Sequence, residues 1–188
     1  MLEVICGPMF SGKSEELIRR IRRAEIAKQR VVVFKHALDD RYCSERVMSH
    51  LARGVQAQPL QGSRGLSEWT KTDVDLIAID EAQFFDDGIV GVCRELAAKT
   101  RVVVAGLDLD AKGEPFGPMP ALLALADKVV KLTAVCMQCG EDATRSFQTD
   151  GRVTGMITAS AEGLAGNIQV GAAEAYEARC SRCWRSGQ

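Results

Sequence analysis

The sequence predicts an α/β protein in which a parallel sheet forms the core and a small cysteine-tied subdomain follows it. Short apolar runs, rich in Val and Ile, alternate with longer segments of helical periodicity, as in strand–helix–strand units. Two C-x-x-C pairs lie near the C-terminus, beyond a change in composition at about residue 132. We therefore expect a core over residues 1–131 and a subdomain over residues 132–188.

Five apolar runs are the predicted strands, at residues 2–6, 31–34, 76–79, 102–105 and 129–132. Each run is short and almost continuously apolar, which is typical of strands that a parallel sheet buries on both faces. The predicted helices lie at residues 11–29, 89–98 and 118–126. In the first helix Leu17, Ile18 and Ile21 recur at helical spacing, while the arginines mostly fall elsewhere. We expect this helix to have a basic outer side.

Charge and hydropathy exclude some classes of protein. The 24 basic residues are balanced by 25 acidic ones, so the net charge is −1, which disfavours a polycation that coats nucleic acid. No apolar run approaches the ~18 residues that a membrane-spanning helix needs. Because the first predicted strand begins directly after Met1, we expect no signal peptide. The expected protein is cytoplasmic and binds neither nucleic acid nor membranes.

A phosphate-binding motif connects the first strand to the first helix. It matches G-x-x-x-x-G-K-[ST] and reads Gly7-Pro8-Met9-Phe10-Ser11-Gly12-Lys13-Ser14. Glycines let backbone N–H groups turn towards phosphate oxygens, and the helix N-terminus adds partial positive charge. Lys13 would reach the β- and γ-phosphates of ATP, and Ser14 would bind Mg²⁺. The sequence therefore predicts a P-loop core that binds ATP with Mg²⁺.

Two acids end the third predicted strand. Asp80 and Glu81 follow an apolar run, as the Mg²⁺-binding strand of P-loop enzymes does. We expect Asp80 to hold Mg²⁺ and Glu81 to be the general base that takes a proton from an attacking hydroxyl. Solvated acids at a strand end are the alternative, and the phosphate loop favours the functional interpretation.

Weaker candidates follow the second and third strands. Asp39 and Asp40 precede Arg41, whose guanidinium suits a phosphate; an ordinary charged turn explains this segment at least as well. Gln83 is followed by Phe84 and a second Phe. Adjacent aromatic residues after a strand are usually core, although one of them could form a wall for a planar base.

The two cysteine pairs predict a metal site. Cys136, Cys139, Cys180 and Cys183 supply four thiolates, and a closed Cys₄ shell is typical of structural Zn²⁺. A redox dithiol and an iron–sulfur cluster are alternatives, and the doubled C-x-x-C pattern favours zinc.

Other reactive side chains have simpler interpretations. The arginines and Trp184 around the last cysteine pair form a solvated rim rather than a nucleic-acid patch, given the net charge of −1. Cys6 and Cys93 stand in apolar patterns and are expected in the core. His36 and His50 lack the spacing of metal ligands.

Six strings along the chain resemble the type II thymidine kinase family, the cytosolic kind with a zinc-held lasso. They are GPMFSGKS at residues 7–14, DDRY at 39–42, DEAQFF at 80–85, GLDLDAKGEPFG at 106–117, KLTAVCMQC at 131–139 and GAAEAYEARCSRC at 171–183. They span nearly the whole chain in order. The resemblance implies a RecA-like core and ATP-dependent transfer of a γ-phosphoryl group to the 5′-hydroxyl of thymidine, with deoxyuridine as a further acceptor.

The resemblance also implies roles for particular residues. Glu81 matches the general base, and the nucleotide-binding segments are residues 7–14, Asp39–Asp40–Arg41, Asp80 and Gln83. The residues that match the nucleoside pocket and lasso are Phe84, Leu107, Ala111, Phe116, Asn167, Ile168, Gln169, Val170, Gly171 and Tyr176. It further implies a homotetramer that thymidine triphosphate inhibits by feedback.

This sequence departs from the family pattern in two places. Ala111 stands where an aromatic residue usually packs near the nucleoside, which changes the expected shape of the pocket. Residues 150–166 are rich in small side chains, which predicts a looser lasso tip. A comparison of thymidine with deoxyuridine and deoxycytidine as substrates tests both expectations.

Two other functions compete with this one. Residues 80–83 read like a helicase motif, but an ATP-driven nucleic-acid motor needs a second lobe for which 188 residues leave no room. A non-catalytic zinc-binding interaction module would have no use for Lys13, Ser14, Asp80 and Glu81 together.

Overall fold

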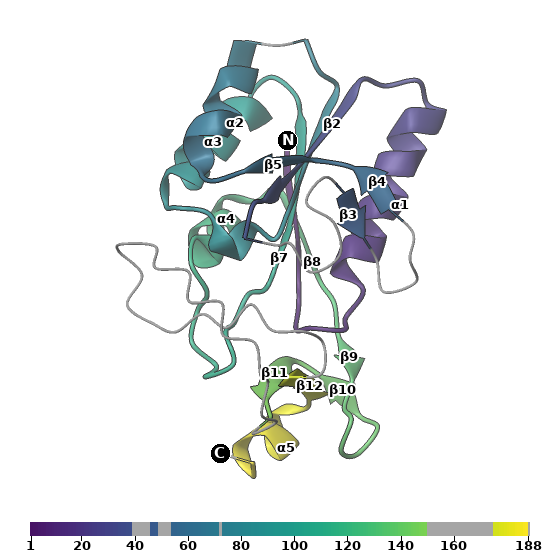
Figure 1. The fold of residues 1–188 in the computed structure, drawn as a ribbon, viewed down its shortest axis with the longest axis vertical. Coiled ribbons are helices and arrows are strands. Elements are labelled where there is room, and N and C mark those ends of the chain that lie inside the picture. Colours follow the sequence, from purple (N-terminus) through teal and green to yellow (C-terminus); the bar gives the residue numbers. More distant parts are fainter. Residues whose placement is uncertain (39–45, 49–53, 72, 150–174, 188) are drawn as a thin grey trace.

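A six-stranded parallel sheet forms the centre of the molecule (Figure 1). The computed structural model describes residues 1–38, 46–48, 54–71, 73–149 and 175–187. The strand order is β5-β2-β6-β7-β1-β8, and every neighbouring pair is parallel. The bounds are β1 Leu2–Cys6, β2 Val31–His36, β5 Gln58–Leu60, β6 Leu76–Asp80, β7 Arg101–Gly106 and β8 Lys128–Lys131.

The five predicted strands are confirmed as β1, β2, β6, β7 and β8. β5 adds a sixth, which the sequence hides because its three residues include Pro59; proline in a sheet is confined largely to edges and strand ends. The expectation that every strand is buried on both faces is wrong for β8. Val129 is 45% exposed, because β8 lies at the edge of the sheet.

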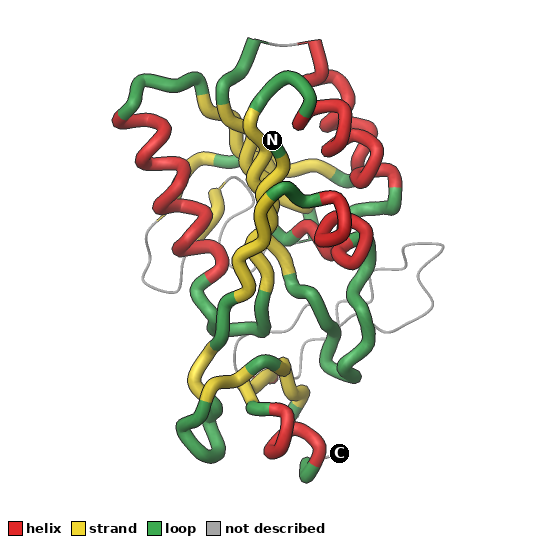
Figure 2. Tube along the Cα trace, turned by 180° about the vertical axis from the view of Figure 1, so that it is seen from behind, coloured by secondary structure: helices red, strands yellow, loops and turns green. Residues whose placement is uncertain are grey.

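Helices cover both faces of the sheet (Figures 1 and 2). The helix α1 (Lys13–Ile26) lies on one face, and α2 (Ser63–Ser67), α3 (Gly88–Ala97) and α4 (Met119–Leu125) lie on the other. Alternate strand residues serve the two layers: Ile5 and Ala78 pack with α1, and Val4 and Ile77 pack in the cluster that includes α3 and α4. The three predicted helices are confirmed as α1, α3 and α4, within their expected ranges or one residue beyond them.

The predicted basic outer side of α1 holds except at Arg20. Arg20 is 7% exposed and donates from Nη1 to Glu3 Oε2 at 2.5 Å, and from Nε to Glu16 Oε1 at 2.9 Å. Arg101 pairs with the other oxygen of Glu3 at 2.6 Å. A buried carboxylate on β1, an interior strand of the sheet, therefore draws one arginine of the helix inward, since an unpaired buried charge would be costly.

The cysteine-rich segment forms a separate small unit beyond the carboxyl edge of the sheet (Figure 1). Its elements are β9 Ala134–Val135, β10 Asp142–Ala143, β11 Arg145–Gln148, β12 Tyr176–Arg179 and α5 Ser181–Arg185. They make two antiparallel pairs, β9 with β10 and β11 with β12. The remaining elements are the pair β3 Arg46–Met48 and β4 Gly54–Gln56 and the 3₁₀ turns η1 Glu68–Lys71 and η2 Ala82–Phe84.

Within the described part of the chain, the helices are all too short or too polar to cross a lipid bilayer.

Candidate active site and metal site

The phosphate loop lies between β1 and α1, as predicted. Its backbone has a positive φ at Gly7 (146°), Phe10 (64°) and Gly12 (81°). A Cβ atom at Gly7 would lie 2.4 Å from the carbonyl oxygen of Leu132, so only glycine fits there. The loop thus passes directly against the residue that follows β8.

Lys13 folds back onto its own loop. Its Nζ donates to the carbonyl oxygen of Pro8 at 2.7 Å, and Ser11 Oγ donates to the same oxygen at 2.8 Å. A phosphate would offer the ammonium group a charged acceptor in place of this carbonyl, and such bonds are roughly twice as strong as neutral ones. The side chain is therefore positioned to transfer its hydrogen bond to a nucleotide.

Glu81 stands in a left-handed turn directly after β6. Its φ of 53° and ψ of 43° are uncommon for a residue other than glycine, and such strain gathers at functional sites. Asp80 is 5% exposed, and its Oδ1 accepts the backbone N–H of Glu81 at 3.0 Å. The turn fixes both acids at the carboxyl end of β6.

Gln83 connects Glu81 to the segment that follows β7. Its Nε2 donates to Glu81 Oε2 at 2.5 Å, and its Oε1 accepts the backbone N–H of Leu107 at 3.0 Å. The side chain is buried, at 2% exposed. Two glycines make room for this residue. A Cβ atom at Gly106 would lie 2.8 Å from Gln83 Oε1, and a Cβ atom at Gly117 would lie 2.3 Å from the carbonyl oxygen of Gln83.

The phosphate loop and Glu81 share the carboxyl edge of the sheet. The loop follows β1 and Glu81 follows β6, and β7 lies between these strands. Ligands of open α/β sheets bind outside this edge. Lys35, 1% exposed, is the register partner of Asp80 on β2, and no motif in the sequence pointed to it.

An ion pair between an exposed lysine and a buried aspartate lies close to the phosphate loop. Lys131 Nζ binds Asp108 Oδ2 at 2.7 Å, and Asp108 is 6% exposed. Burial raises the pKa of the Cys6 thiol to about 11; Asp108 adds to the rise, and Lys131 and Lys13 oppose it. The thiol is therefore protonated at neutral pH and is not a nucleophile, which agrees with its predicted place in the core.

Aromatic residues gather beside Glu81. The rings of Phe84 and Phe116 meet edge to face, with centroids 5.7 Å apart at 90°. The ring of His36 is also near, with its centroid 6.2 Å from that of Phe84. Burial lowers the pKa of His36, so the ring is neutral near pH 7. Phe84 and Phe116 come together as predicted, and the Gln83 bond brings Leu107 to the same side.

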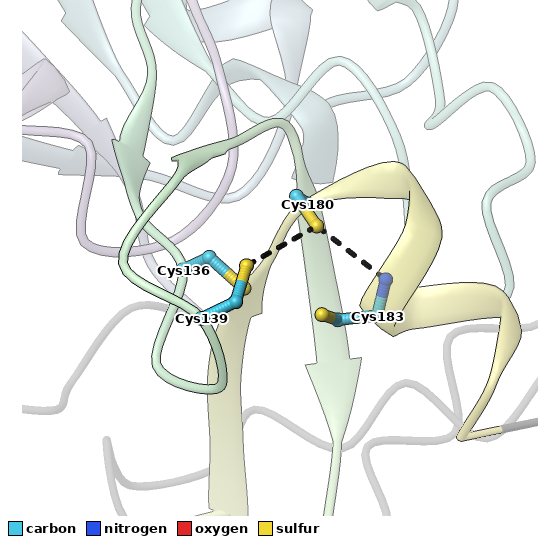
Figure 3. Close-up of side chains that lie close together, drawn as sticks. All are labelled: Cys136, Cys139, Cys180 and Cys183. Atoms are coloured by element: carbon cyan, nitrogen blue, oxygen red, sulfur yellow. Dashed lines mark hydrogen bonds between the residues drawn. The ribbon is translucent and has the colours of Figure 1, made fainter.

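Four sulfur atoms in the small subdomain form one cluster (Figure 3). The ligand atoms of Cys136, Cys139, Cys180 and Cys183 lie within 4.8 Å of one another, and the Sγ atoms of Cys139 and Cys180 are 3.8 Å apart. Four thiolates bound to one Zn²⁺ at about 2.3 Å would be about 3.8 Å apart in a tetrahedron. The cluster therefore fits a single zinc ion.

The surroundings favour a thiolate at Cys136, whereas hydrogen bonds with Cys180 and Cys139 raise the pKa of Cys183 to about 12. Burial opposes ionisation of Cys136, but backbone hydrogen bonds from Cys180, Gln138 and Cys139 outweigh it and lower its pKa to about 6. The N–H of Cys183 also points at Cys180 Sγ, at 3.4 Å. The cysteines that the structure describes are all free thiols, which suits a metal site rather than a disulfide.

Residues 1–184 match a family model described as thymidine kinase. The chain belongs to the thymidine kinase family. Membership of this family implies a phosphotransferase that acts on nucleosides. A crystal structure described as a DNA replication initiation factor is also similar, at 14% identity and a TM-score of 0.42, over 70% of this chain and 39% of that one. A similarity this weak carries no argument about this chain.

Several of the residues expected from the thymidine kinase family lie outside the described part of the chain. These are Asp39, Asp40, Arg41, Asn167, Ile168, Gln169, Val170 and Gly171, together with the rest of residues 150–174. Tyr176 is described; it lies half-buried on β12, where it pairs with Gln148. The binding roles of all of these residues stay predictions.

Contacts across the small subdomain add residues that sequence reasoning missed. Ser146 Oγ accepts the N–H of Met9 in the phosphate loop at 3.0 Å. Trp184, interpreted as part of a solvated rim, instead donates its indole N–H towards the carbonyl oxygens of Ala111 at 3.3 Å and Ser146 at 3.2 Å. The one available signal was an aromatic residue directly after a metal ligand, in a chain with only two tryptophans.

Proposed function

We propose that this chain is a thymidine kinase that transfers the γ-phosphoryl group of ATP to the 5′-hydroxyl of thymidine. The observation that carries the proposal is the placement of Glu81: it is held in a left-handed turn at the same sheet edge as the phosphate loop. Together with the family match over residues 1–184, this favours a base aimed at an acceptor hydroxyl.

The phosphate loop supplies the nucleotide site in this proposal. Lys13 and the backbone N–H groups of the loop bind the phosphates, apart from Pro8, which has none, and Met9, whose N–H donates to Ser146. Ser14 and Asp80 are the residues that would hold Mg²⁺. Bound there, the ion would neutralise charge on the phosphoryl oxygens. Most of the catalysis in such reactions comes from positioning and electrostatics.

Glu81 takes the proton from the 5′-hydroxyl as the oxygen bonds to the γ-phosphorus, and the bond from that phosphorus to the bridging oxygen breaks, which releases ADP. Gln83 fixes one carboxylate oxygen by donating to it at 2.5 Å. Because a general base must be within hydrogen-bond reach of its proton, this restriction on rotation favours productive geometry.

The nucleoside would lie beside Phe84, Leu107 and Phe116, with Tyr176 and the lasso residues 167–171 covering the base. An apolar wall with a few polar groups suits a pyrimidine. Ala111 offers less side-chain surface than an aromatic residue would, so deoxyuridine belongs in the test. A homotetramer, feedback inhibition by thymidine triphosphate and a cytoplasmic location are further proposals that rest on the resemblance alone.

A phosphoryl-transfer assay tests the function. We expect the purified chain to convert thymidine to its monophosphate with ATP, ahead of deoxycytidine and the purine deoxynucleosides. Glu81→Gln should retain ATP binding, measured by calorimetry, and lose about 10²–10⁴-fold in kcat.

Two results would overturn the proposal. One is wild-type kcat in Glu81→Gln. The other is ATP hydrolysis that single-stranded DNA stimulates in the absence of any nucleoside phosphorylation, which would favour a nucleic-acid motor. A protein that binds no ATP would instead be an interaction module.

A further inference from the structure

Trp184 joins the zinc-tied subdomain to the loop at residues 107–117. It directly follows the zinc ligand Cys183 on α5. Its Nε1 lies 3.3 Å from the carbonyl oxygen of Ala111 and 3.2 Å from that of Ser146. One N–H is thus shared between the loop and β11, and a tryptophan N–H that is taken out of water needs such an acceptor.

The loop approaches the indole ring closely. Gly113 has a φ of 80°, and a Cβ atom there would lie 3.0 Å from the ring carbon Cη2 of Trp184. Glycine therefore serves both the turn and the contact. Trp184 is partly buried, which agrees with a ring that packs against the loop.

The same loop forms part of the predicted nucleoside site. The backbone N–H of Asp110 donates to the carbonyl oxygen of Glu114 at 2.9 Å, and the backbone N–H of Phe116 donates to the carbonyl oxygen of Asp108 at 3.1 Å. Its tip therefore rests on Trp184, and its base carries Phe116 against Phe84. These hydrogen bonds close the loop into a hairpin, which links its tip to its base.

The subdomain also contacts the phosphate loop. Ser146 Oγ accepts the N–H of Met9, and Phe10 packs against the small cluster that includes Ala134 and Ala178. The helix α5 has only five residues, too few to be stable alone, and two zinc ligands bracket its first turn. Its position therefore depends on the metal site.

We infer that Trp184 is a positioning residue for nucleoside binding. The zinc-tied helix α5 holds its indole against Ala111 and Gly113, and this contact keeps Phe116 in place in the pocket wall. The inference rests on the proposed function for its substrate, but not for the contact itself.

Three variants test it: Trp184→Ala, which removes ring and donor; Trp184→Phe, which keeps a ring without the donor; and Trp69→Phe, a control in which the other tryptophan changes. Trp69 packs edge-on against Phe34, 5.3 Å between centroids, in the core. Each zinc-loaded variant is measured by hydrogen exchange of the peptide spanning residues 107–117, by metal content and by steady-state kinetics.

In Trp184→Ala we expect loop exchange to be about tenfold faster, since a hydrogen bond and a packed ring are both lost. The KM for thymidine should rise about tenfold, with kcat and the KM for ATP within about threefold of wild type and zinc content unchanged. Trp184→Phe should give a loop exchange rate and a KM for thymidine between those of wild type and Trp184→Ala. Trp69→Phe should leave loop exchange at the wild-type rate.

Unchanged loop exchange in Trp184→Ala would overturn the inference, and so would faster exchange with an unchanged KM for thymidine. A fall in kcat with KM constant would also contradict it, because positioning of the wall should act on binding. Exchange needs no catalysis. A wild-type chain that phosphorylates no nucleoside would therefore refute the proposed function, while the exchange result would still decide the loop contact.

Discussion

The carboxyl edge of the sheet and the zinc-tied subdomain both contact the candidate active site, but they are held in different ways. The edge rests on strands whose apolar residues, such as Ile77, Ile79 and Val104, are fully buried between two helical layers. The subdomain has a buried cluster built around Ala134, Ala143, Ala178 and the metal ligand Cys136. Alanine side chains bury little apolar area, so we expect a metal bound by the four cysteines to supply most of the stability that a larger core would give.

Zinc removal should have the largest effect, because it should destabilise the subdomain and leave the sheet intact. With a chelator, residues 134–148 and 175–187 should lose protection from hydrogen exchange, while β1, β6 and β7 keep theirs. Structural zinc in small domains contributes apparent energies of about 10–16 kcal/mol at pH 7, which is more than this cluster can supply. Exchange followed by mass spectrometry, with thermal unfolding of the same samples, measures both regions.

A pair of cysteine variants provides the control for zinc removal. Cys180→Ser should reproduce the zinc-free pattern. Cys93→Ala, which removes a buried thiol from the core cluster, should keep the metal and loosen the core instead. A zinc-free subdomain that stays protected would contradict the comparison, because its own apolar cluster would then suffice.

Gln83→Ala should act within the core edge and spare the subdomain. The substitution removes the donor to Glu81 and leaves the N–H of Leu107 without this acceptor. A hydrogen bond to a charged group is worth about 1.5–3 kcal/mol, so we expect kcat to fall by about 10–100-fold. A rise in the KM for ATP would show in addition that Gln83 contacts the nucleotide, as the family resemblance implies.

Steady-state kinetics and zinc content measure this effect. Gln29→Ala, an exposed glutamine beyond the end of α1, is the matched control and should match wild type. Wild-type kcat in Gln83→Ala would mean that Glu81 is positioned without this amide, and that Gln83 serves only the loop at Leu107.

The core and the subdomain also differ in how much of their structure the sequence could predict. The strands, α1 and the phosphate loop depend on neighbouring residues, and periodicity and the motif predicted them. The zinc ligands were found because cysteine pairs carry a spacing signal of their own. The contacts of the subdomain carry no such signal: Met9 meets Ser146 across 137 positions, and Ala111 meets Trp184 across 73.

Buried charge was hidden for a similar reason. In the sequence, Arg20 is one of several arginines of the first predicted helix, and nothing local distinguishes it from the others. Its partner Glu3 lies in a predicted strand whose other residues are apolar. Gln83 was expected to bind the nucleotide, and that role stays a prediction; its bonds to Glu81 and Leu107 required the fold. Local pattern thus predicts elements, and long-range polar pairing decides how the site is assembled.

The smallest predicted effect concerns the ionisation of Glu16 on α1 and its contribution to stability. Hydrogen bonds from Arg19, followed by those from Arg20, lower the pKa of Glu16 to about 2 against an ordinary 4.5. A lowered pKa in the folded state means that the ionised pair stabilises the protein above about pH 4.5, and that this contribution is lost as the pH falls towards 2. The side chain is 20% exposed, so screening should leave about 1 kcal/mol.

Urea unfolding of wild type and Glu16→Gln at pH 6, 4 and 3 measures this contribution. The free-energy difference between them should be largest at pH 6 and should shrink towards pH 3. Acid also releases zinc by protonating thiolates, but it does so in both proteins, so the difference isolates Glu16. Glu25→Gln, which replaces an exposed acid on the same helix, is the matched control. A wild-type advantage that stays constant from pH 6 to pH 3 would mean that Glu16 stabilises α1 through packing rather than charge. Loss of stability in acid would then be expected from the zinc-tied subdomain, and not from this ion pair of the core.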